Sequence, residues 1–576
     1  MKQALLALTL LFSVLICKGQ AWEWAKGVSC SNLHGVSEGW IVKTDYSGNV
    51  FSAGINYASH ICFDTDTFYN DVPGANQFVI VKHDSSGNLL WAHAGMGGSS
   101  VAEDLAIDDH GNTYLLIAFE DTVIVNNQLI VNPHFNPLLG DNNCFCILKF
   151  DPAGHLLWAQ PGNNLVDDGD YLRHAAIAVD DNSNIYVAGT FFDSVYTLGS
   201  FTLTSSGWQQ SISDIFIAKY DSSGNNVLWA KKFGGNGYEY VCGLSLDLNN
   251  NIFVAGAFSS ANIDFGTTTL TYTGSYVSSS LFTNMFLAKL DDAGNTIWAR
   301  QSNGCARAIS VKSDNSGNVY VCGGLYDTVV SFGNYHMHPA FNNSAGFLAK
   351  YDALGNDLWA KPLEATSHPN AHYNVYDIAS DACNNAWITG IITNNNGVIL
   401  DSSHSVFAPP GSSDPSYLAE FTSEGALLYG QALMGGGDDN LGIAADLLGN
   451  IYIAGDITDT LVLGNVTLYN NDWTEQVFVA RYRPLINCNL HTPLQTNSKV
   501  YLALFPNPAT NTLTIQYNST NKATAGIYDI TGRLMGSYPL TGSTTTISVQ
   551  NLPPGIYQCR VTDGEHSLTK KLIIMQ

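Results

Sequence analysis

Two patterns of apolar and polar positions recur along most of the chain, and each predicts strands joined by a tight turn. In the first pattern a polar turn of the form D-x-x-G-N precedes a short run of β-branched and aromatic residues, which favour strands. Its copies are DYSGNVFSAG (45–54), DDHGNTYLLIA (108–118), DDNSNIYVAG (180–189), DLNNNIFVAG (247–256), DNSGNVYVCG (314–323), DACNNAWITG (381–390) and DLLGNIYIAG (446–455).

The second pattern is a hairpin in which a strand, a turn and a second strand follow one another. The turn again carries an acidic or hydroxyl residue and then glycine, and the second strand ends on an aromatic residue. Its complete copies are FVIVKHDSSGNLLWA (78–92), FCILKFDPAGHLLWA (145–159), IFIAKYDSSGNNVLWA (215–230), MFLAKLDDAGNTIWA (285–299), GFLAKYDALGNDLWA (346–360) and SYLAEFTSEGALLYG (416–430).

The turn residues have a steric reason. The Asp side chain can cap backbone amides of the turn, and the fourth position must often adopt a left-handed conformation, which Gly and Asn tolerate best. In the second pattern that position is always Gly. In the first pattern it is occupied by Gly48, Gly111, Ser183, Asn250, Gly317, Asn384 and Gly449.

Together the two patterns predict repeats of four antiparallel strands, named A to D from the first to the last, and such units arranged around an axis form a β-propeller. A further C strand, VFVARY (477–482), has no D strand after it, while WEWAKG (22–27) resembles a D strand with no C strand before it. We therefore expect an all-β, seven-bladed propeller in which the N-terminal strand completes the last blade and removes an exposed edge.

The repeat cores G-N-x-Y-V-x-G and F-[VI]-A-K-x-D resemble the bacterial seven-bladed propeller repeats (SBBP-like) of exported proteins, over residues 22–485. This resemblance implies a fold much more than an activity. The D-x-x-G-x-x-x-W string is also similar to the tryptophan-docking repeats of quinone-dependent propeller dehydrogenases, but the spacing from the Asp differs. The sequence thus predicts inter-blade packing by Trp91, Trp158, Trp229, Trp298 and Trp359.

Strand alternation separates the connections onto two faces. The tight turns join A to B and C to D on one face, and the B-to-C and D-to-A connections lie on the other. The B-to-C connections are long and varied, for example 56–76 and 401–415. Varied loops on a rigid scaffold are where binding residues concentrate, so a binding surface is expected on the B–C/D–A face. The alternative is that part of each connection forms an extra hairpin.

Candidate binding residues come from that face. The position seven before each first-pattern Asp is mixed in charge, contains no His and forms no obvious carboxylate pair, which argues against a catalytic centre. Trp208 and Trp473 lie in B–C connections, where aromatics suit stacking on sugars or partner side chains. The predicted binding set is Glu38, Arg173, Trp208, Tyr240, Arg307, Asp439 and Trp473.

Composition narrows the functional classes. Hydrophobic residues make up 45% of the 576 residues, enough for buried cores, and only 13% are charged. The net charge of −25 disfavours nucleic-acid binding. The leading hypothesis is a non-catalytic protein that binds a protein or glycan partner. The alternatives are an exported hydrolase or lyase acting on polymers, and a structural component that self-assembles.

No cofactor is predicted, and calcium stays open. Cys144 and Cys146 are expected to pack in a sheet rather than ligate a metal, and His336-x-His338 supplies two ligands of an incomplete site. Hard oxygen ligands for calcium could come from Asp167, Asp168, Asp170, Asp438 and Asp439, although no calcium-loop motif is matched.

The C-terminal stretch carries FPNPATNTLTI (505–515), IYDITGRLM (527–535), LPPGIYQCRV (552–561) and KKLIIMQ (570–576). These blocks resemble the type A sorting domain of the type IX secretion system, which implies export across the outer membrane of a Gram-negative bacterium. Its implied partners are the secretion machinery and a sortase-like surface peptidase. The residues that carry the resemblance are Pro506, Asn507, Pro508, Gly532, Gly555, Tyr557, Lys570 and Lys571.

Turn spacing predicts five strands in this stretch and an immunoglobulin-like sandwich. At the other end, Met1 to Ala21 has the order of a secretory signal peptide, and Ile16 before Cys17 argues against a lipid anchor. We expect no transmembrane segment in the mature chain, and a protein secreted or held at the outer surface. The expected parts are a signal peptide (1–20), the propeller (21–485), a linker (486–499) and the sorting domain (500–576).

Overall fold

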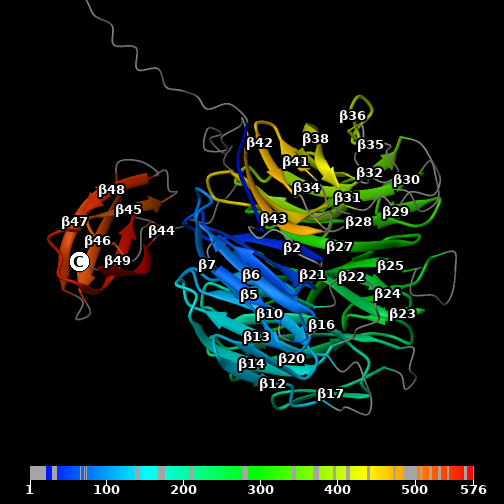
Figure 1. Ribbon diagram of the computed structural model, residues 1–576, viewed down its shortest axis with the longest axis horizontal. Helices are drawn as coiled ribbons and strands as arrows, with labels where there is room; N and C mark the ends of the chain where they lie inside the picture. The colour runs from blue at the N-terminus through cyan, green and yellow to red at the C-terminus, as the bar shows by residue number, and fades with distance from the viewer. Residues whose placement is uncertain are drawn as a thin grey trace, which may run out of the picture. The chain divides into compact units, whose positions relative to one another are not determined.

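We describe the protein from a computed structural model (Figure 1). The structure describes residues 21–28, 36–64, 66–70, 72, 74–135, 143–165, 175–206, 212–274, 283–339, 345–366, 375–392, 397–409, 415–436, 441–458, 460–470, 475–484, 502–505, 509–517, 522–529, 533–540, 544–563 and 567–574. The chain forms two compact units, Met1–Leu490 and His491–Gln576, and each is described by itself. This boundary lies within the predicted linker.

The first unit is a series of antiparallel four-stranded repeats in the order A-B-C-D, as predicted. Sheet 1 is β2 (Ser37–Thr44), β3 (Val50–Asn56), β6 (Gln77–His83) and β7 (Leu89–Ala94); sheet 2 is β9 (Ser100–Ile107), β10 (Thr113–Phe119), β13 (Cys144–Phe150) and β14 (Leu156–Asn164); sheet 3 is β15 (Ala175–Val179), β16 (Ile185–Phe191), β19 (Asp214–Tyr220) and β20 (Val227–Phe233); sheet 4 is β21 (Glu239–Leu246), β22 (Ile252–Phe258), β25 (Asn284–Leu290) and β26 (Thr296–Gln301).

The later repeats have the same order, and the last one draws a strand from the N-terminal end. Sheet 5 contains β27 (Ala306–Ser313), β28 (Val319–Leu325), β31 (Ala345–Tyr351) and β32 (Asp357–Ala365); sheet 6 contains β33 (Val375–Ser380), β34 (Ala386–Ile391), β37 (Pro415–Phe421) and β38 (Leu427–Gly436); sheet 7 is β39 (Gly442–Ala445), β40 (Ile451–Ile457), β43 (Gln476–Arg483) and β1 (Ala21–Gly27). Strand β1 is antiparallel to β43 with Ala25 opposite Ala480.

The A strands of successive sheets lie against one another. Strand β2 contacts β9, and the contacts continue through β15, β21, β27, β33 and β39, which contacts β2 again. In Figure 1 the dark-blue N-terminal strand lies beside the orange strand β43. The two ends of the repeat region therefore meet in one sheet.

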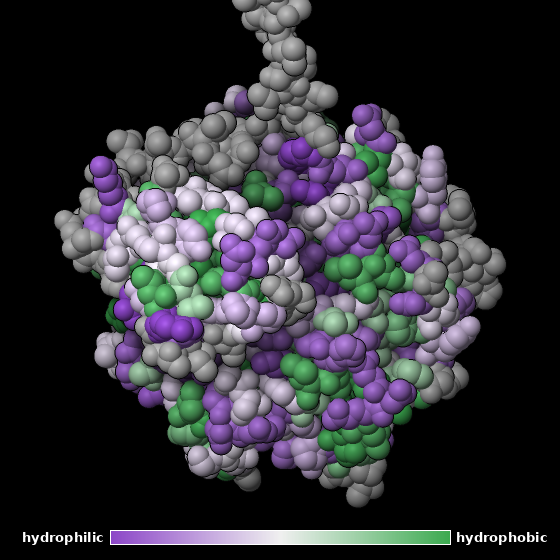
Figure 2. All heavy atoms as spheres, turned by 90° about the vertical axis from the view of Figure 1, so that its left-hand side faces the viewer, coloured by the Kyte–Doolittle hydropathy of each residue, from purple (hydrophilic) through white to green (hydrophobic). Residues whose placement is uncertain are grey.

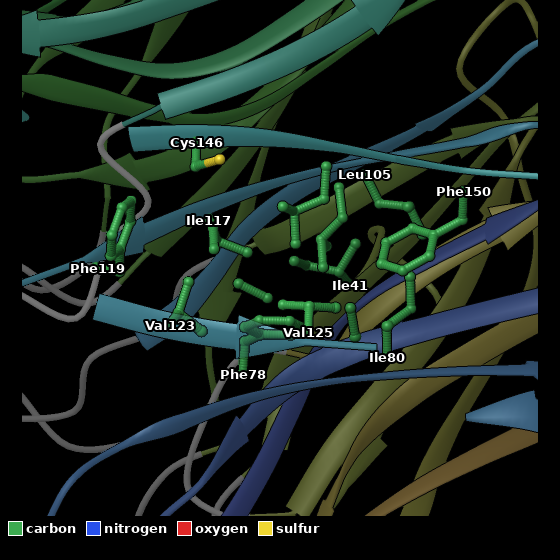
Figure 3. Close-up of a cluster of buried hydrophobic side chains, with 14 of the residues drawn as sticks. Ile41, Phe78, Ile80, Leu105, Ile117, Phe119, Val123, Val125, Cys146 and Phe150 are labelled. Atoms are coloured by element: carbon green, nitrogen blue, oxygen red, sulfur yellow. The ribbon is translucent and has the colours of Figure 1, made fainter. Parts of the chain in front are cut away.

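Hydrophobic cores lie between consecutive sheets. Figure 3 shows one core, in which Ile41 and Ile80 of sheet 1 meet Leu105, Ile117 and Phe150 of sheet 2. A core of the same kind lies between sheets 7 and 1, where Val42 and Val50 meet Tyr452 and Val479. The strands are buried on both faces by their neighbours, which explains the near-continuous apolar runs in the B and C strands.

The turns have the predicted chemistry. The Oδ1 atom of Asp45 accepts hydrogen bonds from the amides of Ser47 and Asn49, both at 2.9 Å, and Oδ2 accepts one from the Asn49 side chain at 2.7 Å. At the fourth position Ser183 has a φ of 60° and Asn250 a φ of 61°. The left-handed conformation expected from the sequence is confirmed even where the residue is not glycine.

The tryptophans pack between sheets, as predicted. Each indole of a D strand lies on the glycine of the C–D turn of the next sheet. A Cβ atom built on that glycine would come within 2.6–2.9 Å of the ring, for the pairs Trp91–Gly154, Trp158–Gly224, Trp229–Gly294, Trp298–Gly355 and Trp359–Gly425. Only glycine fits under the indole, so the recurrent D-x-x-G and W are two halves of one contact.

The second unit consists of two small sheets. One is β44 (Leu502–Phe505), β45 (Thr512–Tyr517) and β48 (Thr544–Ser548); the other is β47 (Leu534–Leu540), β46 (Ala523–Asp529), β49 (Gly555–Thr562) and β50 (Ser567–Ile574). Leu513 and Ile515 of the first sheet share a core with Ile527, Val561 and Leu572 of the second. Strands β44 and β47 were not predicted, because Pro506 directly after β44 and Pro539 within β47 mask a strand pattern.

The cysteines and the hydropathy agree with the expectations for the described parts. Cys144 and Cys146 are buried and free, and burial raises the pKa of the Cys144 thiol to about 12, which suits packing rather than reactivity. Cys62 and Cys383 each take part in a disulfide bond. Across the described ranges no helix is long and apolar enough to cross a membrane.

Candidate functional site

The face that carries the A–B turns is tied together by hydrogen bonds between sheets. Ser183 Oγ donates to Asp108 Oδ2 at 3.0 Å, and Asn384 Nδ2 donates to Ser316 Oγ at 3.0 Å. Between sheets 7 and 1, the Tyr452 hydroxyl donates to the carbonyl of Gly48 at 3.3 Å. The polar groups of this face thus largely satisfy one another.

On the opposite face the B–C connections contain short hairpins. They are β4 (His60–Phe63) with β5 (Asp66–Tyr69), β11 (Thr122–Val125) with β12 (Gln128–Val131), β17 (Val195–Leu198) with β18 (Phe201–Thr204), β23 (Asn262–Asp264) with β24 (Thr269–Thr271), β29 (Val330–Phe332) with β30 (Tyr335–Met337), β35 (Gly397–Ile399) with β36 (Ser405–Phe407), and β41 (Thr460–Leu463) with β42 (Val466–Tyr469). The alternative that part of each connection forms an extra hairpin is confirmed.

These insertion hairpins link sheets. The second strand of each lies against the D strand of its own sheet, as β12 does against β14 and β42 against β1. The first strand reaches the end of the preceding D strand: β35 pairs with β32, with Ile399 opposite Glu364, and Ser331 bridges to Asn303. Much of each connection is therefore structural.

The hairpins have a sequence signal of their own, which is separate from the two repeat patterns. Several have two-residue turns with positive φ: Asn126 at 50°, Asn127 at 63°, Gly199 at 55°, Gly333 at 56° and Gly464 at 57°. Asn-Asn and Gly-Ser or Gly-Asn pairs between strand-like segments are typical of tight hairpins.

The outer side of each insertion hairpin is exposed and differs between sheets. Alternate residues of a strand point to one side, so the second strand presents two outward positions. They are Thr67 and Tyr69, Leu129 and Val131, Thr202 and Thr204, Thr269 and Thr271, His336 and His338, Ser405 and Phe407, and Thr467 and Tyr469. None is an acid, lysine or arginine. In Figure 2, hydrophobic residues on the displayed face form small patches separated by polar ones.

A second group of polar residues lies at the axis of the A strands. Lys43 Nζ of sheet 1 is 3.8 Å from Asp104 Oδ1 of sheet 2. The charges of Lys43, Asp377 and Asp104 all act on the amine of Lys312 in sheet 5. Sheets 1 and 5 are not neighbours, so these four side chains lie around the axis that the A strands share. Desolvation by the surrounding protein, and then the charge of Lys43, lowers the pKa of Lys312 to about 8, although its side chain keeps contact with solvent.

The two aspartates at the axis, Asp104 and Asp377, also form hydrogen bonds to neighbouring A strands. Asp104 Oδ2 accepts a hydrogen bond from the amide of Ile177 at 3.0 Å, and Asp377 Oδ2 accepts one from the amide of Ile443 at 3.0 Å. The candidate binding positions lie seven before each turn Asp, whereas these axial residues lie two or four before it. The axial group was missed for that reason.

Of the predicted binding residues, the structure brings two together. The guanidinium Cζ of Arg307 lies 5.5 Å from the ring centroid of Tyr240, a cation–π contact between the A strands of sheets 5 and 4. Tyr240 also stacks on Tyr238 with the ring centroids 6.1 Å apart. Tyr240 and Arg307 are 2% and 7% exposed, and Glu38 is half-buried in β2. Outside the described residues lie Arg173, Trp208, Asp439 and Trp473.

Two carboxyl groups are buried at the same edge of sheets 3 and 4. Asp214 and Glu239 are both fully buried. Burial raises the pKa of Glu239 to about 8, although its carboxyl accepts hydrogen bonds from Ser260 Oγ and from the amide of Gly235 at 2.9 Å. Asp214 Oδ2 lies 3.5 Å from Lys232 Nζ. Asp214 Oδ1 contacts Gly234, where a Cβ atom would lie only 1.5 Å from it, so no space remains between Asp214 and Gly234.

The described residues supply no complete ligand set for the metal sites considered from the sequence. Among the described residues no group of three or more His, Cys, Asp and Glu side chains could hold a metal ion. His336 shares a hydrogen bond with Ser331 Oγ at 2.7 Å. The candidate calcium ligands Asp167, Asp168, Asp170, Asp438 and Asp439 lie outside the described residues.

Four of the predicted sorting residues lie in the second unit's β49 and β50. Gly555 begins β49, and the Tyr557 hydroxyl donates to the carbonyl of Pro553 at 2.7 Å. Lys570 is exposed and lies opposite Cys559, and Lys571 lies opposite Gln558 in the register of the two strands. Pro506, Asn507, Pro508 and Gly532 lie outside the described residues.

Comparison with known proteins gives partial matches for the body of the chain. An uncharacterised WD repeat-containing protein of Acanthamoeba polyphaga mimivirus is 30% identical over 191 residues, which are 30% of this chain and 13% of that protein. The chain thus spans a small part of the curated relative that it matches. A fungal alcohol oxidase structure with copper covers 96% of this chain, with all of its own length aligned, at 10% identity and a TM-score of 0.36.

Two further solved structures are similar at low identity. Pyrococcus horikoshii acylaminoacyl peptidase aligns with 84% of this chain and 59% of its own, at 10% identity and a TM-score of 0.36. PorZ of Porphyromonas gingivalis, a surface component of the type IX secretion system, aligns with 93% of this chain and 81% of its own, at 13% identity and a TM-score of 0.18.

The C-terminal unit has a family match. Residues 503–575 match the secretion system C-terminal sorting domain. The match covers the unit formed by β44 to β50 and the sequence blocks singled out above. The chain is therefore a propeller-like β-repeat protein that ends in a type IX secretion sorting domain, which directs it across the outer membrane to the cell surface or the medium.

Proposed function

We propose that the repeat unit is a seven-bladed propeller of the SBBP-like bacterial type, closed by β1, and that the C-terminal unit is an immunoglobulin-like sandwich. Three observations support the closed ring. The A strands contact one another in sequence and β39 contacts β2. Strand β1 pairs with β43. Trp24 of β1 lies on Gly87 of sheet 1, as each other docking tryptophan lies on the next sheet's turn.

On this scaffold the protein acts as a non-catalytic interaction protein whose B–C/D–A face binds a protein or glycan. One observation carries this proposal: the two faces differ in kind. The A–B/C–D face repeats the same capped turns and its polar groups bond one another. The opposite face carries outward hairpin residues that vary around the ring, although sheets 1 and 7 share a Thr–Tyr pair and sheets 3 and 4 share a Thr–Thr pair. Variation on a rigid frame is typical of a recognition surface.

A polymer-degrading hydrolase or lyase is the alternative, and it would need paired carboxyls open to substrate. Within the described sheets, Asp214 and Glu239 are two carboxyls at one edge, but both are fully buried and Asp214 packs against Gly234. A catalytic acid must come within hydrogen-bond reach of the substrate. The burial of both groups therefore favours the non-catalytic role.

Export supplies the first set of partners. The sorting domain is recognised by the type IX machinery, and we propose that a sortase-like surface peptidase then removes it. The propeller would remain attached to the outer surface or be released. A size measurement of the mature chain separates a ligand-binding monomer from a self-assembling surface component.

The test is a binding screen with residues 21–576. Soluble and insoluble polysaccharides and isolated envelope proteins are offered to the immobilised chain, and the same polymers are assayed for new reducing ends. We expect saturable binding without turnover. Turnover of any of these polymers would contradict the proposal and favour the hydrolase or lyase.

A further inference from the structure

The insertion hairpins of three consecutive sheets present an aromatic side chain at the same place. Tyr69 in β5, Phe407 in β36 and Tyr469 in β42 are each the last residue of the second hairpin strand. They are 65%, 62% and 70% exposed. Sheets 6, 7 and 1 are neighbours through their A strands, so the three rings follow one another around the rim.

A hydroxyl side chain accompanies each ring. Two positions earlier on the same side of the strand stand Thr67, Ser405 and Thr467, all exposed. Each hairpin thus offers one exposed aromatic ring, which in Tyr69 also stacks on His60 with the ring centroids 6.0 Å apart, and one hydroxyl that can both donate and accept a hydrogen bond. The pattern is hydroxyl-x-aromatic, repeated three times.

The other sheets lack this pair at the equivalent positions. Sheet 2 has Leu129 and Val131, sheet 3 has Thr202 and Thr204, sheet 4 has Thr269 and Thr271, and sheet 5 has His336 and His338. The three aromatic pairs are therefore a property of one side of the rim and do not follow from the repeat itself. We call Thr67, Tyr69, Ser405, Phe407, Thr467 and Tyr469 the aromatic arc.

The arc also has no charged member, although the protein carries a net charge of −25. Exposing an aromatic ring to water is unfavourable, and stacking the ring on an apolar surface lowers its free energy. The C–H faces of a pyranose ring provide such a surface, and its hydroxyls match the Ser and Thr side chains. A charged polymer would find no partner here. Three equivalent contacts in a row suit a polymer, because linked weak contacts add through effective concentration.

We propose that the aromatic arc is a binding site for a neutral polysaccharide chain, which lies along the rim across sheets 6, 7 and 1. Each sugar contact consists of a ring stacked on Tyr69, Phe407 or Tyr469 and a hydrogen bond to the neighbouring hydroxyl. The proposal deepens the binding function argued above and rests on it.

The test uses residues 21–576 and affinity electrophoresis through gels that contain soluble neutral polymers, namely mixed-linkage glucan, xylan and mannan, with alginate as the acidic comparison. The wild-type chain is retarded by at least one neutral polymer, and salt at high concentration leaves the retardation unchanged. The triple variant Tyr69→Ala/Phe407→Ala/Tyr469→Ala loses at least about tenfold in affinity. The variant Tyr69→Trp/Phe407→Trp/Tyr469→Trp retains binding, because it keeps the stacking surfaces.

A matched triple variant controls for folding and for general surface effects. Val131→Ala/Thr204→Ala/Thr271→Ala alters the same strand position in sheets 2, 3 and 4, and its affinity stays within about twofold of wild type. Equal melting temperatures of the two triple variants exclude a loss through unfolding.

The possible outcomes separate this inference from the proposed function. Wild-type binding to a neutral glycan that survives in the arc variant overturns the inference. Binding only to alginate, abolished by salt, also overturns it. Binding to an envelope protein without any glycan leaves the proposed function standing and rejects the aromatic arc as a sugar site. Turnover without stable binding rejects both.

Discussion

The indole nitrogen of Trp24 donates a hydrogen bond to the backbone carbonyl of Ser85 at 3.1 Å. The same bond joins Trp91 to Pro152 at 3.2 Å and Trp298 to Ala353 at 3.2 Å, in each case from a D strand to the C–D turn of the next sheet. Trp24 stands near the N-terminal end and yet makes the contact of a last D strand. The seam between sheets 7 and 1 therefore has the same tryptophan–turn contact as the junctions between sheets 1 and 2 and between sheets 4 and 5.

The glycine under each indole gives a test of that junction. Gly154 has a φ of +89°, and a Cβ there would lie 2.7 Å from Trp91 Cγ. We expect Gly154→Ala to cost about 2–4 kcal/mol, because it adds a clash to the strain of a left-handed alanine. Gly111→Ala is the matched control, since φ is +76° but its nearest neighbour is Pro152 at 3.6 Å. It should cost about 1–2 kcal/mol. Urea unfolding measures both, and equal losses would contradict the docking role.

Glu420 predicts a pH dependence. It stands where most C strands have lysine, is 4% exposed and accepts a hydrogen bond from Asn385 Nδ2 at 3.0 Å. Burial, and then the charge of Asp381, raises the pKa of Glu420 to about 7. The folded state thus holds a proton that the unfolded state releases near its ordinary pKa of 4.5. The contribution of Glu420 to the free energy of unfolding is therefore complete below pH 4.5 and is lost as the pH rises through about 7.

We therefore expect Glu420→Gln to melt at the same temperature as wild type in acid, below the ordinary carboxyl pKa, and at a higher temperature above neutral pH. Differential scanning calorimetry across that range measures the difference. Glu420→Lys should also stabilise the fold above neutral pH, because lysine at this position pairs with the turn aspartate, as Lys350 does with Asp314 at 3.1 Å. A pH-independent gap between Glu420→Gln and wild type would contradict the assignment.

The axial group predicts a lysine that titrates near neutral pH. The pKa of Lys312 is about 8, lowered by desolvation and by the charge of Lys43 and partly restored by Asp377. We expect Lys43→Gln to raise this pKa and Asp377→Asn to lower it. Reductive methylation with ¹³C and NMR titration resolves the amine. Asp84→Asn, in an outer C–D turn, serves as the control and should leave Lys312 unchanged.

The sorting domain predicts an export phenotype. Strand β50 pairs with β49 along its length, from Ser567 opposite Thr562 to Ile574 opposite Gly555. Deleting 570–576 should leave the chain in the periplasm, because it removes most of that strand. Lys570→Ala/Lys571→Ala keeps the strand and separates recognition of the basic residues from folding. Fractionation and immunoblotting locate each variant, and normal export of the deletion would contradict the assignment.

The repeat could be predicted because its steric demands are local. The capped turn needs Asp and a left-handed residue within a few positions, and the docking contact needs the Gly and Trp of one short hairpin. The junction between sheets 6 and 7 is also visible in the sequence. Its hairpin has Glu420, Thr422 and Tyr429 where the other copies have Lys, Asp and Trp. Sheet 7 has no C–D turn for an indole to dock on, and Tyr429 instead stacks on Tyr482 with their centroids 5.3 Å apart.

The sites were harder to predict because they depend on contacts across the ring. Lys43 and Lys312 are far apart in sequence and meet only at the axis. Tyr240 and Arg307 occupy one repeat position, but the sequence could not show that they bury each other. The sequence predicted the insertion hairpins only as an alternative. Which of their residues point outward can be assigned only from the strand register.

Closure of the ring depends most on β1 being the outermost strand of sheet 7. Ala25 lies opposite Ala480, and Ala230 lies opposite Ala218 in sheet 3, so the two alanine pairs occupy equivalent places in their sheets. The measurement is disulfide formation in Ala25→Cys/Ala480→Cys under mild oxidation, read by mass spectrometry of the linked peptides. A closed ring predicts a yield close to that of Ala218→Cys/Ala230→Cys and none for Ala25→Cys/Ala218→Cys. Unlinked thiols at positions 25 and 480, beside a fully formed sheet 3 disulfide, would contradict it.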